Sequence, residues 1–100
     1  MILNNEFEPI RDWAKEKGIL DKGDPKTQFV KLLEEVGELS HGILKQDRLE
    51  IEDAIGDCVV VLTNLAYLCN TSIESCIEGA YSEISGRTGE MINGTFVKDK

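Results

Sequence analysis

The chain has 100 residues, of which 41 % are hydrophobic and 30 % are charged, and its formal net charge is −8. This length and composition are typical of one globular domain, which we expect to cover residues 1–100. The acidic balance argues against a nucleic-acid polymer as a partner, because phosphate backbones bind basic faces. It suits a cation-binding protein if the acidic residues cluster.

Periodicity and capping residues predict four helices followed by a small β-hairpin. In chain order we expect helices over about 8–17, 25–45, 48–69 and 73–84, a loop over 18–24 and the hairpin over 91–97. Asp24 is suited to cap the second helix, with Pro25 at its first position, and Thr71 or Ser72 to cap the fourth. Asn93-Gly94 is typical of a type I′ turn. The expected fold is therefore all-α, an antiparallel bundle of about four helices with a C-terminal hairpin.

Cysteine usage and hydropathy indicate a cytoplasmic protein. Cys58, Cys69 and Cys76 have no CxxC spacing and lie in apolar stretches, so we expect free core thiols in a reducing compartment. No signal peptide is recognisable, and the longest uncharged run, over residues 58–73, is too short to span a bilayer. We therefore expect no membrane partner.

Three glutamates gather on the second helix. Glu34, Glu35 and Glu38 fall within one side of it, and their spacings of three and four residues let the carboxylates converge. Like charges at such spacings repel, and Lys31, one turn before Glu35, offsets part of the repulsion. Taken alone, this pattern indicates a solvated helix face at least as often as it indicates a binding site. The opposite side carries an apolar stripe of Phe29, Leu32, Leu33, Val36 and Ile43.

The third helix adds a second acidic pair. Asp53 and Asp57 share a face that continues into an apolar stripe containing Asn64, and no residue from 58 to 69 is charged. A helix that is apolar on nearly all sides is buried, so these aspartates need a partner. A short turn makes the two helices antiparallel, which brings both acidic groups level. Four or five carboxylates facing one cavity suit Mg²⁺ or Mn²⁺.

These motifs together resemble a known family. Residues 28–39, with their EExxE pattern, followed by residues 53–57 and an apolar run, are similar to the MazG-like all-α nucleoside triphosphate (NTP) pyrophosphohydrolases, phage-type branch. The resemblance covers nearly the whole chain and extends to the Arg87-Thr88-Gly89 tail. It implies cleavage of an NTP between its α and β phosphates, giving a monophosphate and pyrophosphate.

The resemblance also implies roles for individual residues. Glu35 and Glu38 correspond to the ExxE metal ligands, and Asp57 to the last acid of an ExxD motif. Ala54 stands where that motif has its first acid, so we expect Asp53 to take over. Glu34 is a second ligand or the base that orients the attacking water. The expected substrate-binding residues are Lys31, Arg87 and Lys98 for phosphates, Asn64 for sugar or base, and Trp13 for stacking or for the core.

Several alternatives remain open from the sequence. One is another enzyme of the same superfamily, such as phosphoribosyl-ATP pyrophosphohydrolase. Another is an inactive helical partner protein, which Ala54 favours, and a third is a simple divalent-metal binder. The single histidine, His41, argues against a di-iron site, which needs two Glu-x-x-His copies. A homodimer or homotetramer is expected, because so short a chain has too little surface to cover so apolar a third helix alone.

Overall fold

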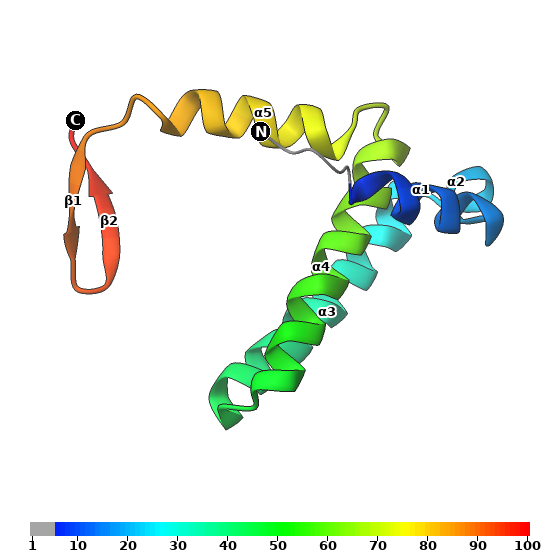
Figure 1. Ribbon diagram of the computed structural model, residues 1–100, viewed down its shortest axis with the longest axis horizontal. Coiled ribbons are helices and arrows are strands. Elements are labelled where there is room, and N and C mark those ends of the chain that lie inside the picture. The colour runs from blue at the N-terminus through cyan, green and yellow to red at the C-terminus, as the bar shows by residue number, and fades with distance from the viewer. Residues whose placement is uncertain (1–5) are drawn as a thin grey trace.

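The computed structural model describes residues 6–100, which form five helices and two strands (Figure 1). The elements, in chain order, are α1 (Phe7–Glu16), α2 (Ile19–Lys22), α3 (Pro25–Lys45), α4 (Arg48–Leu68), α5 (Ile73–Ile84), β1 (Gly89–Ile92) and β2 (Thr95–Lys98). The expected all-α class with a small C-terminal hairpin is confirmed. The four expected helices correspond to α1, α3, α4 and α5.

The segment expected as a plain loop contains the one-turn helix α2, so that expectation was wrong. Gly18 adopts a left-handed conformation with φ of 83°, which ends α1 and redirects the chain. Gly23 then donates a 2.8 Å hydrogen bond to the backbone oxygen of Ile19. α2 packs against α4, and Ile19 and Leu20 are half-buried. Tertiary packing stabilises this turn, because so short a helix is not stable alone.

The capping residues define where the long helices begin. The Thr27 backbone N–H donates to Asp24 Oδ1 at 2.9 Å, and Pro25 occupies the first turn, as expected. Ser72, rather than Thr71, caps α5 by accepting a 3.1 Å hydrogen bond from the Ser75 N–H. These side chains satisfy backbone donors that the first helical turn leaves unpaired.

α3 and α4 lie side by side and antiparallel and form the centre of the molecule (Figure 1). Gly42 allows the close approach near the connecting turn, since a Cβ there would lie only 3.2 Å from the Ile51 backbone nitrogen. The residues of α3 that are buried or half-buried recur at helical spacing. They are Gln28, Leu32, Glu35, Leu39 and Gly42.

This seam is not the apolar stripe that the sequence predicts for α3. Glu35 is 8 % exposed and faces the neighbouring helices, whereas Leu33 is 54 % exposed and Phe29, Val36 and Ile43 are also about half exposed. Glu35 thus lies toward α4, as expected of a carboxylate that faces the acidic pair of the third helix, and most of the apolar stripe is not part of the packed face. The helix is rotated so that its mixed polar face meets α4 and most of the apolar stripe stays uncovered.

α4 is less buried within one chain than its apolar sequence predicts. Its seam carries Ala54 and Val61, but Ile55 and Tyr67 on other sides are about half exposed. The cysteines show the same departure: the thiols are free, but Cys69 and Cys76 are exposed and only Cys58 is half-buried. The expectation of three core thiols was thus wrong for two of them.

α5 and the hairpin form an arm that extends away from the α3–α4 pair (Figure 1). α4 and α5 are bent by 101° at their junction, and every residue from 75 to 100 is exposed. The hairpin pairs Gly89 with Lys98, and its turn has φ of 51° at Asn93 and 83° at Gly94. Two successive positive φ values confirm the expected type I′ turn. We call residues 73–98 the arm.

The overall dimensions are those of an open molecule. The radius of gyration is 15.9 Å, whereas a compact chain of this length has about 13 Å. The accessible surface is 7799 Å², which exceeds by about 2,100 Å² the value of about 5,700 Å² expected for a compact monomer of this mass. Among the described residues, no single helix is long and apolar enough to cross a membrane.

Candidate functional site

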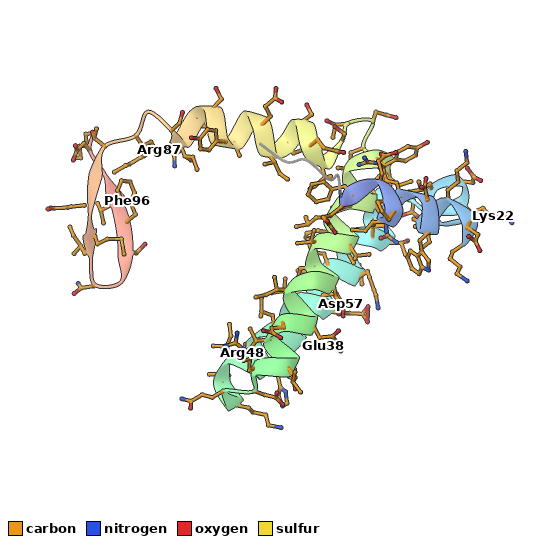
Figure 2. The ribbon with its side chains drawn as sticks, in the orientation of Figure 1. Lys22, Glu38, Arg48, Asp57, Arg87 and Phe96 are labelled. Atoms are coloured by element: carbon orange, nitrogen blue, oxygen red, sulfur yellow. The ribbon has the colours of Figure 1, made fainter. Side chains whose placement is uncertain are left out.

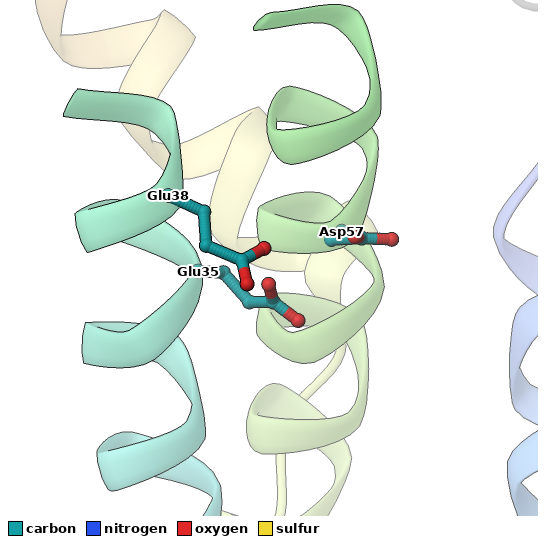
Figure 3. A group of neighbouring side chains, drawn as sticks. All are labelled: Glu35, Glu38 and Asp57. Carbon is teal, nitrogen blue, oxygen red and sulfur yellow. The ribbon is translucent and has the colours of Figure 1, made fainter. Parts of the chain in front are cut away.

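Three carboxylates converge between α3 and α4. Glu35, Glu38 and Asp57 each offer an oxygen atom, and these atoms all lie within 4.8 Å of one another. Figure 3 shows Glu35 and Glu38 extending from α3 toward α4, which carries Asp57. Glu35 and Glu38 share a side because they are three residues apart, and the short α3–α4 turn brings Asp57 level with them. We call these residues the acidic triad.

The electrostatics of the triad favour a bound cation. Burial raises the pKa of Asp57 above its ordinary value, with further contributions from the negative charges of Asp53 and Glu35. Lys31 acts in the opposite direction, and its Nζ lies 3.7 Å from Glu35 Oε2. One exposed lysine does not neutralise three carboxylates. Oxygen donors so close together match what a hard divalent cation such as Mg²⁺ requires.

Two other expected acidic residues lie beside the triad rather than in it. Asp53 is exposed one turn before Asp57, and Glu34 is exposed on the wall of the adjoining cleft. Ala54 is only 2 % exposed, so the position that carries an acid in the family pattern packs inside the helix seam. His41 is exposed and bonds to Glu50 across the helix pair, with 2.7 Å between Nδ1 and Oε2.

A cleft of about 370 Å³ adjoins the triad. Its lining combines charged groups, including Glu35, Asp57 and Lys31, with apolar side chains. Its lining residues come from α1 through α4 and are Trp13, Ile19, Thr27, Gln28, Val30, Lys31, Glu34, Glu35, Asp57, Val60, Val61 and Asn64. A cavity of this size and mixed polarity is typical of small-molecule sites.

Asn64 lines this cleft with an unsatisfied polar atom. The residue is 2 % exposed, and its Oδ1 has no hydrogen-bond partner among residues 6–100. Its neighbour Thr63 is equally buried but donates a 2.7 Å hydrogen bond to the Val59 backbone oxygen. Leaving a buried acceptor unpaired costs about 1–3 kcal/mol. Such exceptions call for an explanation, and a ligand that supplies the missing donor is one.

The two cations expected to bind phosphate from the tail do not reach the triad within one chain. Arg87 forms a 3.0 Å ion pair with Glu83 on the arm, and Lys98 lies in β2. Figure 2 shows Arg87 and Phe96 on the arm, well separated from Glu38 and Asp57. The structure thus gathers Lys31, the triad and the predicted residues Glu34, Asn64 and Trp13 around one site. It leaves Asp53 at the border and Arg87 and Lys98 outside.

Several cleft residues were not singled out from the sequence. Gln28 lies two helical turns before Glu35 on the same face of α3, so helical spacing alone could have identified it. Val60 and Val61 carry no chemical signal, because aliphatic residues on α4 are equally suited to a core. Ile19 could not have been found, because it belongs to the short helix α2 that the sequence does not predict.

The fold and site define a class of helical proteins in which an antiparallel helix pair holds an acidic centre beside a small-molecule cleft. Residues 24–90 match the family model described as the MazG nucleotide pyrophosphohydrolase domain. The chain therefore belongs to this family, which confirms the resemblance drawn from the EExxE and Asp57 motifs.

A phage relative agrees with this assignment. The chain is 44 % identical over 64 residues to an uncharacterized 18.2 kDa protein in the rep-hol intergenic region of Haemophilus phage HP1. The match covers 64 % of this chain and 39 % of the relative, so the chain aligns with less than half of that protein. No solved structure matches the chain.

Proposed function

We propose that this protein is a Mg²⁺-dependent NTP pyrophosphohydrolase, which converts an NTP or dNTP and water into the monophosphate and pyrophosphate. The observation that carries the proposal is the acidic triad, whose oxygens lie within 4.8 Å of one another beside a cleft that is also lined by apolar side chains. Family membership supports the nucleotide chemistry. A role in maintaining the cytoplasmic nucleotide pool would follow.

The triad residues would hold the divalent ion. Glu35, Glu38 and Asp57 supply anionic oxygen, the donor type that Mg²⁺ and Mn²⁺ prefer. A bound divalent ion would supply positive charge that polarises the phosphoryl oxygens. Asp53, exposed one turn from Asp57, is the proposed additional ligand if a second ion binds. Such ions would also let a polyanionic nucleotide approach an acidic protein.

The remaining charged residues of the cleft would handle the proton and the phosphates. The oxygen of water forms a bond to the α-phosphorus, and the bond from that phosphorus to the bridging oxygen breaks as pyrophosphate leaves. Glu34 is exposed on the cleft wall and is the proposed acceptor of the water proton. Lys31 lies beside Glu35 and would contact a phosphate oxygen.

The apolar side chains of the cleft would surround the sugar and base. Trp13 is half exposed and lines the cleft together with Val60 and Val61. An indole face and aliphatic side chains suit the faces of a planar base. Trp13 lines the cleft and is 48 % exposed, which favours a stacking role over a core role.

We also propose that a second copy of the chain covers the exposed apolar surface. Leu33 and Val36 on α3, Leu62 on α4 and Tyr81 on α5 are all between about one third and two thirds exposed. If two chains each hid their excess surface of about 2,100 Å², the dimer would bury about 4,200 Å², within the range of obligate homodimers. A tetramer would extend the same pairing. In either assembly the arm of one copy could bring Arg87 and Lys98 to the site of another.

One observation favours a second candidate function. Ala54 occupies the place of a family acid, and its burial leaves that part of the seam without a carboxylate. A protein that binds divalent ions and a partner without turnover would account for this. Metal would then stabilise the protein, while no nucleotide would be hydrolysed.

The test is an incubation of the full chain with Mg²⁺ and a panel of NTPs and dNTPs, with the products separated by ion exchange. We expect a monophosphate and pyrophosphate, and no reaction in EDTA. Glu35→Gln should be inactive. Glu52→Gln, which changes an exposed acid of α4 outside the triad, is the matched control and should remain active. Orthophosphate as the main product, or activity that survives in Glu35→Gln, would overturn the proposal.

A further inference from the structure

Outside the acidic triad, the most unusual polar group of the molecule is the buried amide of Asn64. Asn64 is 2 % exposed on a helix whose neighbouring positions are largely apolar, and its amide oxygen lacks a partner among the described residues. An apolar residue of similar volume would fill the same space without an unpaired acceptor. Thr63 shows that α4 can satisfy a buried hydroxyl internally, by bonding it to the Val59 oxygen at 2.7 Å. No described residue gives Asn64 Oδ1 a comparable hydrogen bond.

The position of Asn64 relates its amide to the triad. Asn64 and Asp57 both line the cleft and lie seven residues apart on α4, which corresponds to about 10 Å along the helix. Val60 and Val61 lie between them and Trp13 lies on the same cleft. A nucleotide whose phosphates approach the triad would extend its base along α4, past Val60 and Val61, toward Asn64, which is the neutral polar residue of α4 in this cleft.

We infer, on the basis of the proposed function, that Asn64 selects substrates by their base. Its Oδ1 accepts a hydrogen bond from an exocyclic amino group on the edge of the nucleobase, the 4-amino group of cytosine or the 6-amino group of adenine. The acceptor is already desolvated before the ligand binds, so a base that supplies the donor gains a bond. A base of the same shape that lacks the donor leaves the acceptor unpaired and is rejected.

The sugar is the other possible source of a donor. The cleft that Asn64 lines also carries the apolar side chains of Trp13, Ile19, Val30, Val60 and Val61, which suit the faces of a base rather than a ribose with its hydroxyl groups. The proposal therefore assigns the donor to the base. A comparison of ribonucleotides with 2′-deoxyribonucleotides tests the sugar separately, because it changes one hydroxyl group and leaves the base unchanged.

Binding can be measured without turnover, because the chain contains a single tryptophan and this residue lines the cleft. The experiment titrates monophosphates into the full chain with Mg²⁺ and follows Trp13 fluorescence. The probes are two matched pairs: CMP with its analogue that lacks the 4-amino group, and AMP with its analogue that lacks the 6-amino group. In at least one pair we expect the donor-bearing base to bind about tenfold more tightly, the effect of one buried hydrogen bond.

Variants then assign the preference to Asn64. Asn64→Leu should bind both members of that pair equally, and it should melt at an equal or higher temperature because the unpaired acceptor is gone. Asn64→Ser is a second variant in case leucine prevents folding, and it should also lose most of the preference. Thr63→Val removes the neighbouring buried hydroxyl group that does not line the cleft, and it should keep the preference.

A wild-type protein without any preference, or a preference that survives in Asn64→Leu and Asn64→Ser, would overturn the role of Asn64. A variant effect confined to the ribose and deoxyribose comparison would assign the amide to the sugar and overturn base selection. The proposed function fails separately: base-dependent binding without hydrolysis of any triphosphate would reject the enzyme while retaining the binding site.

Discussion

The α3–α4 pair and the arm differ in which side chains are buried and which are exposed. In the helix pair, Glu35 and Asn64 are buried beside a cleft, although burial of such groups is costly without partners. In the arm, Tyr81, Met91 and Phe96 are about half exposed or more, although apolar surface favours burial. The helix pair therefore buries polar groups beside a cleft, whereas the arm leaves large apolar side chains at its surface.

The two regions also differ in how their charges are distributed. Both carry more acidic than basic residues, but the helix pair gathers three acids in the triad, whereas the basic residues Arg87, Lys98 and Lys100 lie near the hairpin. Arg87 lies far from Glu38 and Asp57 of the triad within one chain (Figure 2). Opposite charges separated in this way would attract each other between copies. One chain thus builds the acidic centre by itself, whereas coverage of the arm is part of the proposed association of two copies.

The largest expected effect concerns the triad. Asp57→Asn should lower turnover by more than about 100-fold, because even residues that only support metal ligands contribute about 10–100-fold. In EDTA it should melt at an equal or higher temperature than the parent, since crowding and burial oppose the Asp57 charge, as the raised pKa indicates. It should gain less from Mg²⁺, which stabilises the native state by mass action. Melting curves with and without Mg²⁺, together with a pyrophosphate assay, measure all three effects.

A purely structural role of Asp57 predicts a different result for the same variant. If Asp57 were only a surface acid, Mg²⁺ would shift the melting temperature of both proteins equally and activity would survive. The sign of the pH dependence gives an independent check. A carboxyl group whose pKa is raised by folding stabilises the native state at acidic pH and destabilises it as the pH rises. The metal-free parent should therefore lose more stability than Asp57→Asn between weakly acidic and neutral pH.

The second effect tests the apolar surface of α3. Leu33→Asp places a charge on a side chain that is 54 % exposed in one chain, so the isolated fold should tolerate it. An interface would not, because a desolvated charge without a partner is costly. Sedimentation should show dimers for the parent and monomers for the variant. Lys45→Asp adds an acid on the opposite side of the same helix and should leave the dimer intact; a purely monomeric parent would contradict the proposal.

The third effect concerns the arm. Deletion of residues 86–100 should raise KM about tenfold or more, the cost of losing a charge-assisted contact to a phosphate. The helical core should remain folded, because all of these residues are exposed. Kinetics and circular dichroism separate the two outcomes. Arg87→Ala should reproduce part of the increase and Arg48→Ala none; an unchanged KM would leave the tail with a packing role alone.

A smaller effect is expected where the arm joins the rest of the chain. Arg11 of α1 bonds to Glu74 in the first turn of α5, with 2.8 Å between Nη1 and Oε1, and also contacts Glu8. Its side chain is only 16 % exposed, so the pair is less screened than a surface ion pair. Arg11→Met should destabilise the fold by about 1 kcal/mol in urea unfolding. Arg48→Met, which breaks an exposed ion pair with Glu52, is the control. Equal losses of stability in the two variants would contradict the expected difference between the two ion pairs.

The smallest effect is the cap of α3. Hydrogen bonds from Thr27 lower the pKa of Asp24, the backbone N–H more than the hydroxyl. A carboxyl group whose pKa is lowered by folding contributes stability above its unfolded pKa and loses it as the pH falls through the folded value. Asp24→Ala should therefore melt slightly lower than the parent at neutral pH, and the gap should close in acid. A gap that does not change with pH would mean that the charge contributes nothing.

Local chemistry in the sequence determined the helices and their ends. Asp24, Pro25 and Ser72 act within one helical turn, and Asn93-Gly94 has the positive φ values that the hairpin turn demands. The spacing of Glu35 and Glu38, together with the short turn before α4, was enough to predict that they meet Asp57. These features depend on neighbours a few residues apart or on one antiparallel pairing, so the sequence expresses them directly.

Only the tertiary structure decided which faces are covered. Periodicity gives α3 an apolar stripe, but it does not say that the face with Glu35 meets α4 while Leu33 stays exposed. The bend of 101° after α4 removes the arm from the site and with it Arg87, although the sequence suggests that tail cations bind phosphate. Helix rotation and the direction of the arm depend on packing between distant segments, and a pattern along one chain does not contain that packing.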